Sequence, residues 1–251
     1  MTAVAIIQAR MSSSRLPGKV LMPLVGIPVL GHVVERLSYC RMIDNIVVAT
    51  SLEASDDLIE DYCKKINVNV FRGSLDDVLD RYYQAAKIYQ ADPVVRITAD
   101  CPAIDPVVVD AVIAGFLAGS YDLYGLGGEF PDGLDCSVFS FSAIERAWKE
   151  ARLKSEREHV GPYIENNPDL FQNGALKLFY GLSSQRWTLD EAADYELLTK
   201  IFEKLYRSDS PFMTHEVLNV LKEDSNLSSI NNGIVRNEGY IKSLSNEGTA
   251  K

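Results

Sequence analysis

The chain has 251 residues, of which 35 are Asp or Glu and 25 are Lys or Arg, so its formal net charge is −10. This acidity argues against a nucleic-acid or anionic-membrane surface, and a mean hydropathy of −0.04 with 24% charged residues argues against disordered and membrane-spanning classes. The four cysteines form no CxxC pair, which predicts reduced thiols and a cytoplasmic location instead of a disulfide or zinc framework.

Short β-rich runs alternate with helix-length segments along the first part of the chain. Each of those segments repeats apolar residues at helical spacing, so one face of each helix is expected to be buried. This alternation predicts a parallel sheet. Ser55 and Ser74, each followed by aspartates, are expected to cap the second and third helices. The predicted strands are residues 3–7, 45–50, 68–71 and 94–98, and the helices lie within 29–37, 58–62 and 78–86.

The remainder of the chain has a less regular pattern. Glycines and prolines predict a long inserted loop at 121–135. No repeat or linker divides the sequence, so we expect one domain over 1–206 with an extension, 207–251, packed on it. Apolar residues within 212–221 are expected either to pack on that domain or to form a homodimer contact. The other expected elements are a helix at 106–116, a strand at 136–141, helices at 142–152 and 155–166, strands at 176–182 and 186–189, and a helix at 191–206.

A basic loop, QARMSSSRLPGK (8–19), directly follows the first strand. Arg10, Arg15 and Lys19 are the only charged residues in the first 34 positions. Open α/β sheets bind ligands beyond the carboxyl ends of their strands, and cations among serines suit phosphate oxygens. The basic loop therefore predicts a polyphosphate site.

Two common nucleotide-binding motifs do not account for this loop. Val20 follows Gly18 and Lys19 where a P-loop requires Ser or Thr, and no GxGxxG opens the first helix. The triple serine, 12–14, also lacks the GxSxG pattern of a hydrolase nucleophile. A different nucleotide-binding architecture is therefore expected.

Asp100 ends the strand VVRIT within the run TADCP, which places it at the same sheet edge as the basic loop. A carboxylate beside phosphates usually requires a metal, and Mg²⁺ is commonly held by one or two carboxylates together with substrate phosphates. Asp190 is the best candidate for the second carboxylate. Asp194 could support Asp190 or could simply offset a helix dipole.

The sequence resembles the acylneuraminate and 3-deoxy-manno-octulosonate cytidylyltransferase superfamily, most closely its spore-coat polysaccharide branch. The resemblance spans nearly the whole chain. It is carried by IIQARMSSSRLPGKVL (6–21), VVATS (47–51), FRGSLDDVLDRYYQAA (71–86), VVRITADCPAIDP (94–106), FPDGLD (130–135), SEREHVGPYI (155–164), RWTLDEAADYELL (186–198) and RNEGYIKSL (236–244).

The resemblance implies a Rossmann-like, three-layer α/β/α nucleotidyltransferase fold with a mixed, mostly parallel sheet. It implies transfer of CMP from CTP to an acidic or modified sugar of a surface polysaccharide, with Mg²⁺ and release of pyrophosphate. Carried over to this chain, it assigns the triphosphate to Arg10, Arg15 and Lys19, with Ser12 and Ser13 beside them, and Mg²⁺ to Asp100 and Asp190. It also assigns the nucleoside to Ser74, Asp77 and Arg81, and the acceptor to Asp132, Asp135, Arg157, Glu158 and His159. No general base is assigned.

Two other functions stay open at this stage. A glycosyltransferase of the A-type fold would use a carboxylate and a metal with a nucleotide sugar, although TADCP supplies only one acid of the usual DxD pair. A nonenzymatic nucleotide-binding subunit would bind CTP without turnover. Partners are expected to be CTP and a sugar, with neither nucleic acid nor membrane.

Overall fold

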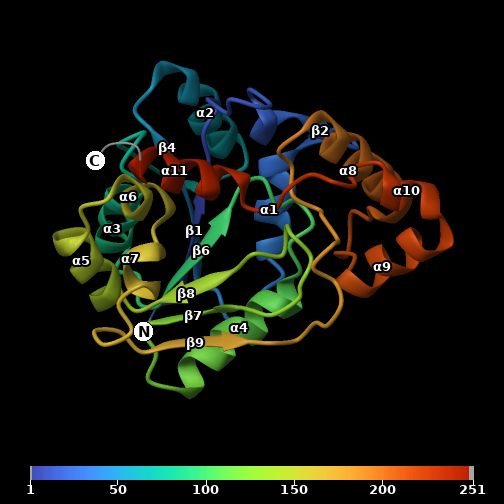
Figure 1. The fold of residues 1–251 in the computed structure, drawn as a ribbon. Helices are drawn as coiled ribbons and strands as arrows, with labels where there is room; N and C mark the ends of the chain where they lie inside the picture. Colours follow the sequence, from blue (N-terminus) through green and yellow to red (C-terminus); the bar gives the residue numbers. More distant parts are fainter. Residues whose placement is uncertain (1, 249–251) are drawn as a thin grey trace.

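Within the described residues, 2–248, a seven-stranded sheet forms the centre of this computed structural model (Figure 1). The strand order is β5-β4-β1-β6-β8-β7-β9, and β8 alone runs against its neighbours. A separate hairpin pairs β2 (Pro23–Leu24) with β3 (Ile27–Pro28). The strands of the main sheet are β1 (Val4–Gln8), β4 (Asn45–Ser51), β5 (Asn69–Gly73), β6 (Val94–Thr98), β7 (Leu123–Leu126), β8 (Ser137–Phe139) and β9 (Asn173–Leu176).

Helices cover both faces of the sheet because successive strand side chains point to opposite sides. Ala5 and Ile7 of β1 belong to one buried core, and Val4 and Ile6 belong to the other. The three layers confirm the predicted α/β/α fold. The first core lies under α1 (Val29–Leu37), α2 (Asp57–Lys65), α4 (Pro106–Ala118) and α8 (Ala192–Leu205). The second lies under α3 (Val78–Ile88), α5 (Phe141–Glu150) and α7 (Pro162–Glu165), and α6 (Lys154–His159) packs against α3.

Three predictions in the second half of the chain are wrong. The expected loop 121–135 contains β7, because this segment pairs with β8 on one side and β9 on the other. The strand expected at 176–182 ends at Leu176, since only 173–176 lie beside β7. Residues 186–189 form no strand, and a single bridge joins Arg186 to Asp132 within the described chain.

The two serine caps are also wrong. Asp56 precedes α2, but its carboxylate turns away from the helix, toward β4 and the basic loop. The N-cap of α3 is Asp77, whose side chain accepts a hydrogen bond from the Asp80 N–H, while Ser74 Oγ accepts one from the Asp77 N–H. The Asp56 carboxylate therefore bonds to Met11 and Thr50 instead of capping α2. Ser74 stabilises the turn before α3, and Asp77 caps the helix itself.

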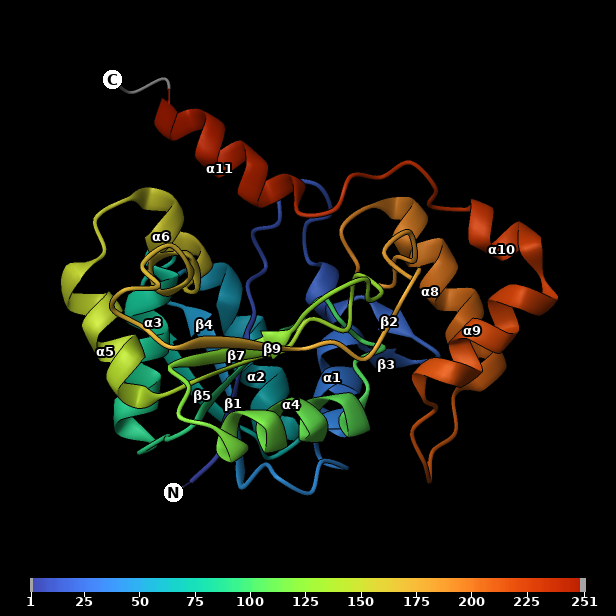
Figure 2. The ribbon, with the colours of Figure 1, turned by 60° about the horizontal axis from the view of Figure 1, so that its bottom comes forward.

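The C-terminal helices are α9 (Thr214–Glu223), α10 (Ser225–Ser229) and α11 (Glu238–Gly248). Helix α9 contacts α8, whereas α11 crosses back over the sheet to α6, as Figure 2 shows. The division into 1–206 and 207–251 stays a prediction, and 249–251 lie outside the described residues. Over the described length, none of the helices has both the size and the apolar character needed to cross a bilayer.

Candidate functional site

The order of the strands brings the predicted site together. The chain passes from β1 to β4 and β5 on one side and then returns to place β6 on the other side of β1. Such a reversal opens a crevice at the carboxyl ends of the two strands. Gln8 and Thr98, the last residues of β1 and β6, are register partners there. The basic loop 8–19 and the TADCP run therefore begin side by side.

The basic loop is held folded by its own backbone and by Asp56. The Gly18 N–H donates to the Met11 carbonyl at 2.9 Å, and Gly18 adopts a left-handed φ of 74° that favours glycine. The Met11 N–H donates to Asp56 Oδ1 at 2.8 Å. Asp56 also accepts from Thr50 Oγ1 and Ser51 Oγ. Burial opposes the charge of Asp56, but these hydrogen bonds lower its pKa overall.

Lys19 lies between the two predicted metal carboxylates. Its Nζ is 2.6 Å from Asp100 Oδ2 and 2.7 Å from Asp190 Oδ1. Burial works to lower the pKa of Lys19, but Asp100 and Asp190 raise it overall. Burial would raise the pKa of Asp100, yet Lys19 brings it down to about 2. Arg15 completes the cluster with its Nη2 at 2.9 Å from Asp190 Oδ2.

A buried arginine that the sequence pattern did not single out, Arg186, supports this cluster. Arg186 donates from Nε to Asp194 Oδ1 at 2.9 Å, from Nη1 to Asp132 Oδ2 at 2.7 Å and from Nη2 to Asp190 Oδ2 at 3.3 Å. Asp194 is fully buried and also accepts the Asp190 N–H at 3.0 Å. Asp194 therefore contacts Asp190, and it also accepts the Glu191 N–H at 2.9 Å in the first turn of α8, so the structure is consistent with both roles that the sequence left open. Arg186 lies four residues before Asp190, and this spacing is the feature of the sequence that could have indicated their contact.

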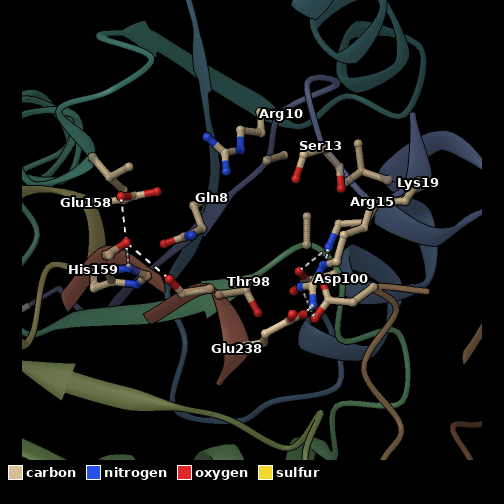
Figure 3. A pocket seen from close by; sticks show the side chains of 18 of the residues that line it. Gln8, Arg10, Ser13, Arg15, Lys19, Thr98, Asp100, Glu158, His159 and Glu238 are labelled. Atoms are coloured by element: carbon tan, nitrogen blue, oxygen red, sulfur yellow. Dashed lines mark hydrogen bonds and ion pairs between the residues drawn. The ribbon is translucent and has the colours of Figure 1, made fainter. Parts of the chain in front are cut away.

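Two cavities flank the cluster. The larger, about 430 Å³, contains the cations of the basic loop (Figure 3), and the smaller, about 220 Å³, lies toward the 127–136 loop. Both are bounded by Arg15, Thr98, Asp100, His159 and Asp190. Of the predicted residues, the larger cavity is also lined by Arg10, Ser13, Lys19, Arg81 and Glu158, and the smaller by Asp132 and Asp135.

Four predicted site residues do not line either cavity. Ser12 is absent from both linings, and Ser74 holds the turn before α3. Asp77 and Arg157 bond to each other, with Arg157 Nε 3.0 Å from Asp77 Oδ2, and so tie α3 to α6. These two side chains fasten the helices together at the border of the site.

Helix α11, to which the sequence pattern assigned no role, supplies a wall of the site. Glu238 Oε2 lies 2.7 Å from Arg15 Nη1, and Ser243 Oγ donates to Glu158 Oε2 at 3.1 Å. The Tyr240 ring packs edge-on against His159 at 5.0 Å between centroids. Figure 3 shows Glu158 and His159 across the cavity from Lys19, whereas Glu238 reaches the cluster around Arg15. The distance along the chain hid these contacts from the sequence.

The donor chemistry at the crevice fits a hard divalent cation. Asp100 and Asp190 present oxygen atoms to one ammonium group, and Mg²⁺ prefers such oxygens together with water and substrate phosphates. Across residues 2–248 no cluster of three or more His, Cys, Asp or Glu side chains suits a metal. An all-protein cage is thus absent from the described chain, and a substrate would have to complete the coordination.

Comparison with known sequences gives one family. Residues 4–212 match the sequence model of a family described as "Cytidylyltransferase". An uncharacterised protein of Methanocaldococcus jannaschii is 38% identical over 245 residues, which span 96% of this chain and 98% of that protein. Protein SpsF of Bacillus subtilis, described as acting in spore coat polysaccharide biosynthesis, is 36% identical over 207 residues, 79% of this chain and 85% of its own length. The 3-deoxy-manno-octulosonate cytidylyltransferase 2 of Hydrogenovibrio crunogenus is 34% identical over 152 residues, 59% of this chain and 56% of its own length.

Comparison with solved structures indicates the same family. The structure of a cytidylyltransferase from Leptospira borgpetersenii serovar Hardjo-bovis has a TM-score of 0.87 at 35% identity and covers 94% of this chain and 100% of that one. A likeness of this extent confirms the three-layer fold derived above. It also extends beyond residue 212, where the family match ends.

Proposed function

Because the chain belongs to the cytidylyltransferase family, we propose that it transfers CMP from CTP to a sugar and releases pyrophosphate. The observation that carries this proposal is the convergence of Asp100 and Asp190 on Lys19 beside the basic loop. Positive groups and paired carboxylates at one sheet edge suit a metal-bound triphosphate.

In this proposal the protein acts by positioning and by charge. Arg10, Arg15 and Lys19 bind the triphosphate and neutralise the charge that develops on the leaving oxygens, with Ser12 and Ser13 beside them. Asp100 and Asp190 would hold Mg²⁺, which supplies Lewis-acid stabilisation of the phosphate oxygens. The nucleoside lies toward Arg81, with Ser74 and Asp77 behind it.

The acceptor is proposed to enter the smaller cavity. Asp132, Asp135 and His159 line it, Glu158 lines the adjoining larger cavity, and Arg157 supports them through α6. An acidic or modified sugar of a surface polysaccharide is the proposed substrate, in keeping with the biosynthetic role named for SpsF. A cytoplasmic location and a homodimer are part of the proposal.

Nucleotide binding can be tested by thermal shift with CTP, ATP, GTP, UTP and dTTP, each with and without Mg²⁺. A ligand at 100 times its Kd stabilises the native state by about 2.7 kcal/mol, which for a chain of this length corresponds to roughly 5–11 °C. We expect a shift of this size with CTP and Mg²⁺ alone. Stabilisation by another nucleotide, or by none, contradicts the proposal.

The chemistry can be tested with Asp100→Ala and an exposed control, Asp61→Ala. Pyrophosphate release from CTP over a panel of acceptor sugars should fall at least about 100-fold in Asp100→Ala, because one metal carboxylate is lost. It should be unchanged in the control, with both variants folded by circular dichroism. Full activity of Asp100→Ala would show that Asp100 is not part of the catalytic site. Transfer of sugar from a nucleotide sugar, without release of pyrophosphate, would favour the glycosyltransferase alternative.

A further inference from the structure

Arg15 is surrounded by carboxylates of the protein itself. Its Nη1 lies 2.7 Å from Glu238 Oε2, its Nη2 lies 2.9 Å from Asp190 Oδ2, and its Nε lies 3.5 Å from Glu191 Oε1. All three nitrogens of the guanidinium group thus face an acid. Because Arg15 is also one of the cations proposed to bind the triphosphate, a phosphate oxygen that reaches it must share Arg15 with these acids or displace one of them.

Two of the three acids are fixed to the body of the protein. Asp190 and Glu191 stand at the start of α8, where the Asp190 N–H donates to Asp194 Oδ2 at 3.0 Å and the Glu191 side chain accepts the Asp194 N–H. Asp194 is fully buried. Neither Asp190 nor Glu191 can move far without disturbing the first turn of α8.

Glu238 differs from these two because it belongs to α11. Among the residues of α11 whose side chains the structure describes, none is part of either core or packs against one. Two of its apolar side chains, Ile241 and Leu244, are 52% and 44% exposed. Figure 2 shows α11 along the outside of the molecule. Since little buried apolar surface holds α11, Glu238 is the acid that a phosphate can displace from Arg15.

The other polar contacts of α11 also reach the proposed site. Ser243 Oγ donates to Glu158 Oε2 at 3.1 Å and lies 3.2 Å from His159 Nε2, and the Tyr240 ring packs on His159. Glu238 lines both cavities. Helix α11 is therefore fastened across the crevice by side chains that the proposed reaction uses (Figure 3).

The charge of the cluster favours displacement of Glu238 over sharing of Arg15. Arg15 and Lys19 together contact four carboxylates, those of Asp100, Asp190, Glu191 and Glu238. A triphosphate carries more negative charge than one Mg²⁺ can neutralise. Asp100 and Asp190 are proposed to face the metal, but Glu238 would face the phosphates. Like charges at such short range repel, so Glu238 opposes the triphosphate as long as it stays at Arg15.

We propose that Glu238 is an internal competitor of the triphosphate for Arg15, and that α11 (238–248) is a strap over the crevice which nucleotide binding releases. This inference rests on the proposed function and adds a regulatory element to the same site. A carboxylate can take the place of a phosphate group because both accept N–H bonds from a guanidinium group. Coupling between two binding events is reciprocal. The factor by which the strap weakens nucleotide binding therefore equals the factor by which bound nucleotide favours its release.

The test uses the full chain with Mg²⁺ and two probes, a non-hydrolysable α,β-methylene analogue of CTP and inorganic tripolyphosphate. Calorimetry gives the Kd of each probe, and hydrogen–deuterium exchange follows the amides of α11. Glu238→Gln keeps the size of the side chain but removes its charge. Ser243→Ala loosens α11 from α6 without touching Arg15. Glu203→Gln, at an exposed acid of α8 that lines neither cavity, is the matched control.

We expect Glu238→Gln to lower the Kd of both probes by about 3- to 10-fold, between the effect of an exposed ion pair and that of a hydrogen bond to a charged group. Ser243→Ala should lower the Kd in the same direction but by less. In the wild type, either probe should speed the exchange of α11 by a factor similar to the one found for Glu238→Gln. That variant itself should show little further change on binding, and Glu203→Gln should match the wild type throughout.

Unchanged or weaker binding in Glu238→Gln overturns the proposal, because Glu238 would then be neutral or would hold Arg15 in place for the phosphate. Slower exchange of α11 with bound probe also overturns it, since the helix would then close on the nucleotide. A gain in Glu238→Gln without any gain in Ser243→Ala overturns the strap, because only the local charge of Glu238 would matter. Failure of the wild type to bind the CTP analogue refutes the proposed function instead. The strap stands in that case if tripolyphosphate with Mg²⁺ still binds and speeds the exchange of α11.

Discussion

Replacement of Asp194 by alanine tests the network that holds the proposed metal carboxylate. The side chain of Asp194 is 0% exposed. Its two oxygens accept hydrogen bonds from Arg186 Nε and Nη2, from Asn231 Nδ2, and from the N–H groups of Asp190 and Glu191, all between 2.9 and 3.0 Å. Burial opposes ionisation, but these donors lower the pKa of Asp194, so it is charged at neutral pH.

The alanine variant leaves Arg186 Nε and the backbone N–H groups of Asp190 and Glu191 without these acceptors, while Arg186 keeps its contacts with Asp132 and Asp190. Removing one partner of a buried pair costs about 3–5 kcal/mol. For a chain of this length each kcal/mol lowers Tm by about 2–4 °C, so the expected loss is roughly 6–20 °C. Asp194→Asn keeps the size and one acceptor and should lie between this variant and the wild type.

Urea and thermal unfolding followed by circular dichroism measure both quantities. Glu196→Ala on the same helix is the matched control, because the Glu196 side chain is 61% exposed and its ion pair with Lys200 spans 3.9 Å. Removing it should change stability by at most about 0.5 kcal/mol. A loss below about 1 kcal/mol in Asp194→Ala would refute the reasoning, since water would then replace the carboxylate at little cost.

Three further predictions follow from single contacts. Gly133→Ala places a Cβ 2.6 Å from the Trp187 carbonyl carbon, at a residue whose φ is +108°. The free energy of unfolding measured in urea should fall by about 1–3 kcal/mol, and a value equal to that of the wild type would contradict this. Asp56→Ala removes the acceptor of the Met11 N–H, and should weaken CTP binding in calorimetry while costing about 1–3 kcal/mol in stability; unchanged CTP affinity would show that Asp56 does not hold the basic loop. Burial and Asp135 raise the pKa of Asp132 from 3.8 to about 6. The folded state then binds more protons than the unfolded state between these values, so the free energy of unfolding should fall as pH rises from about 4 to 6, by at most about 3 kcal/mol from this group. Denaturation of Asp132→Asn across that range should lack this fall, and an identical pH dependence in both proteins would contradict it.

Local pattern accounts for much of the fold. The strands β1, β4, β5 and β6 and the helices between them follow from apolar periodicity, because burial of one face leaves its mark within a few residues of the chain. The basic loop and Asp100 could be identified in the same way, since each directly follows a predicted strand. Segments whose partners are distant were missed. Residues 123–126 become a strand only through β8 and β9.

The composition of the site depended on contacts between distant parts of the chain. The sequence by itself determined that cations, serines and Asp100 would meet at the carboxyl edge of a parallel sheet. Only the tertiary structure decided that Glu238 reaches Arg15 across 223 residues and that Arg186 joins Asp132 to Asp190. The physical reason is that periodicity records which face of an element is buried, whereas pairing of charges depends on which elements the folded chain brings together.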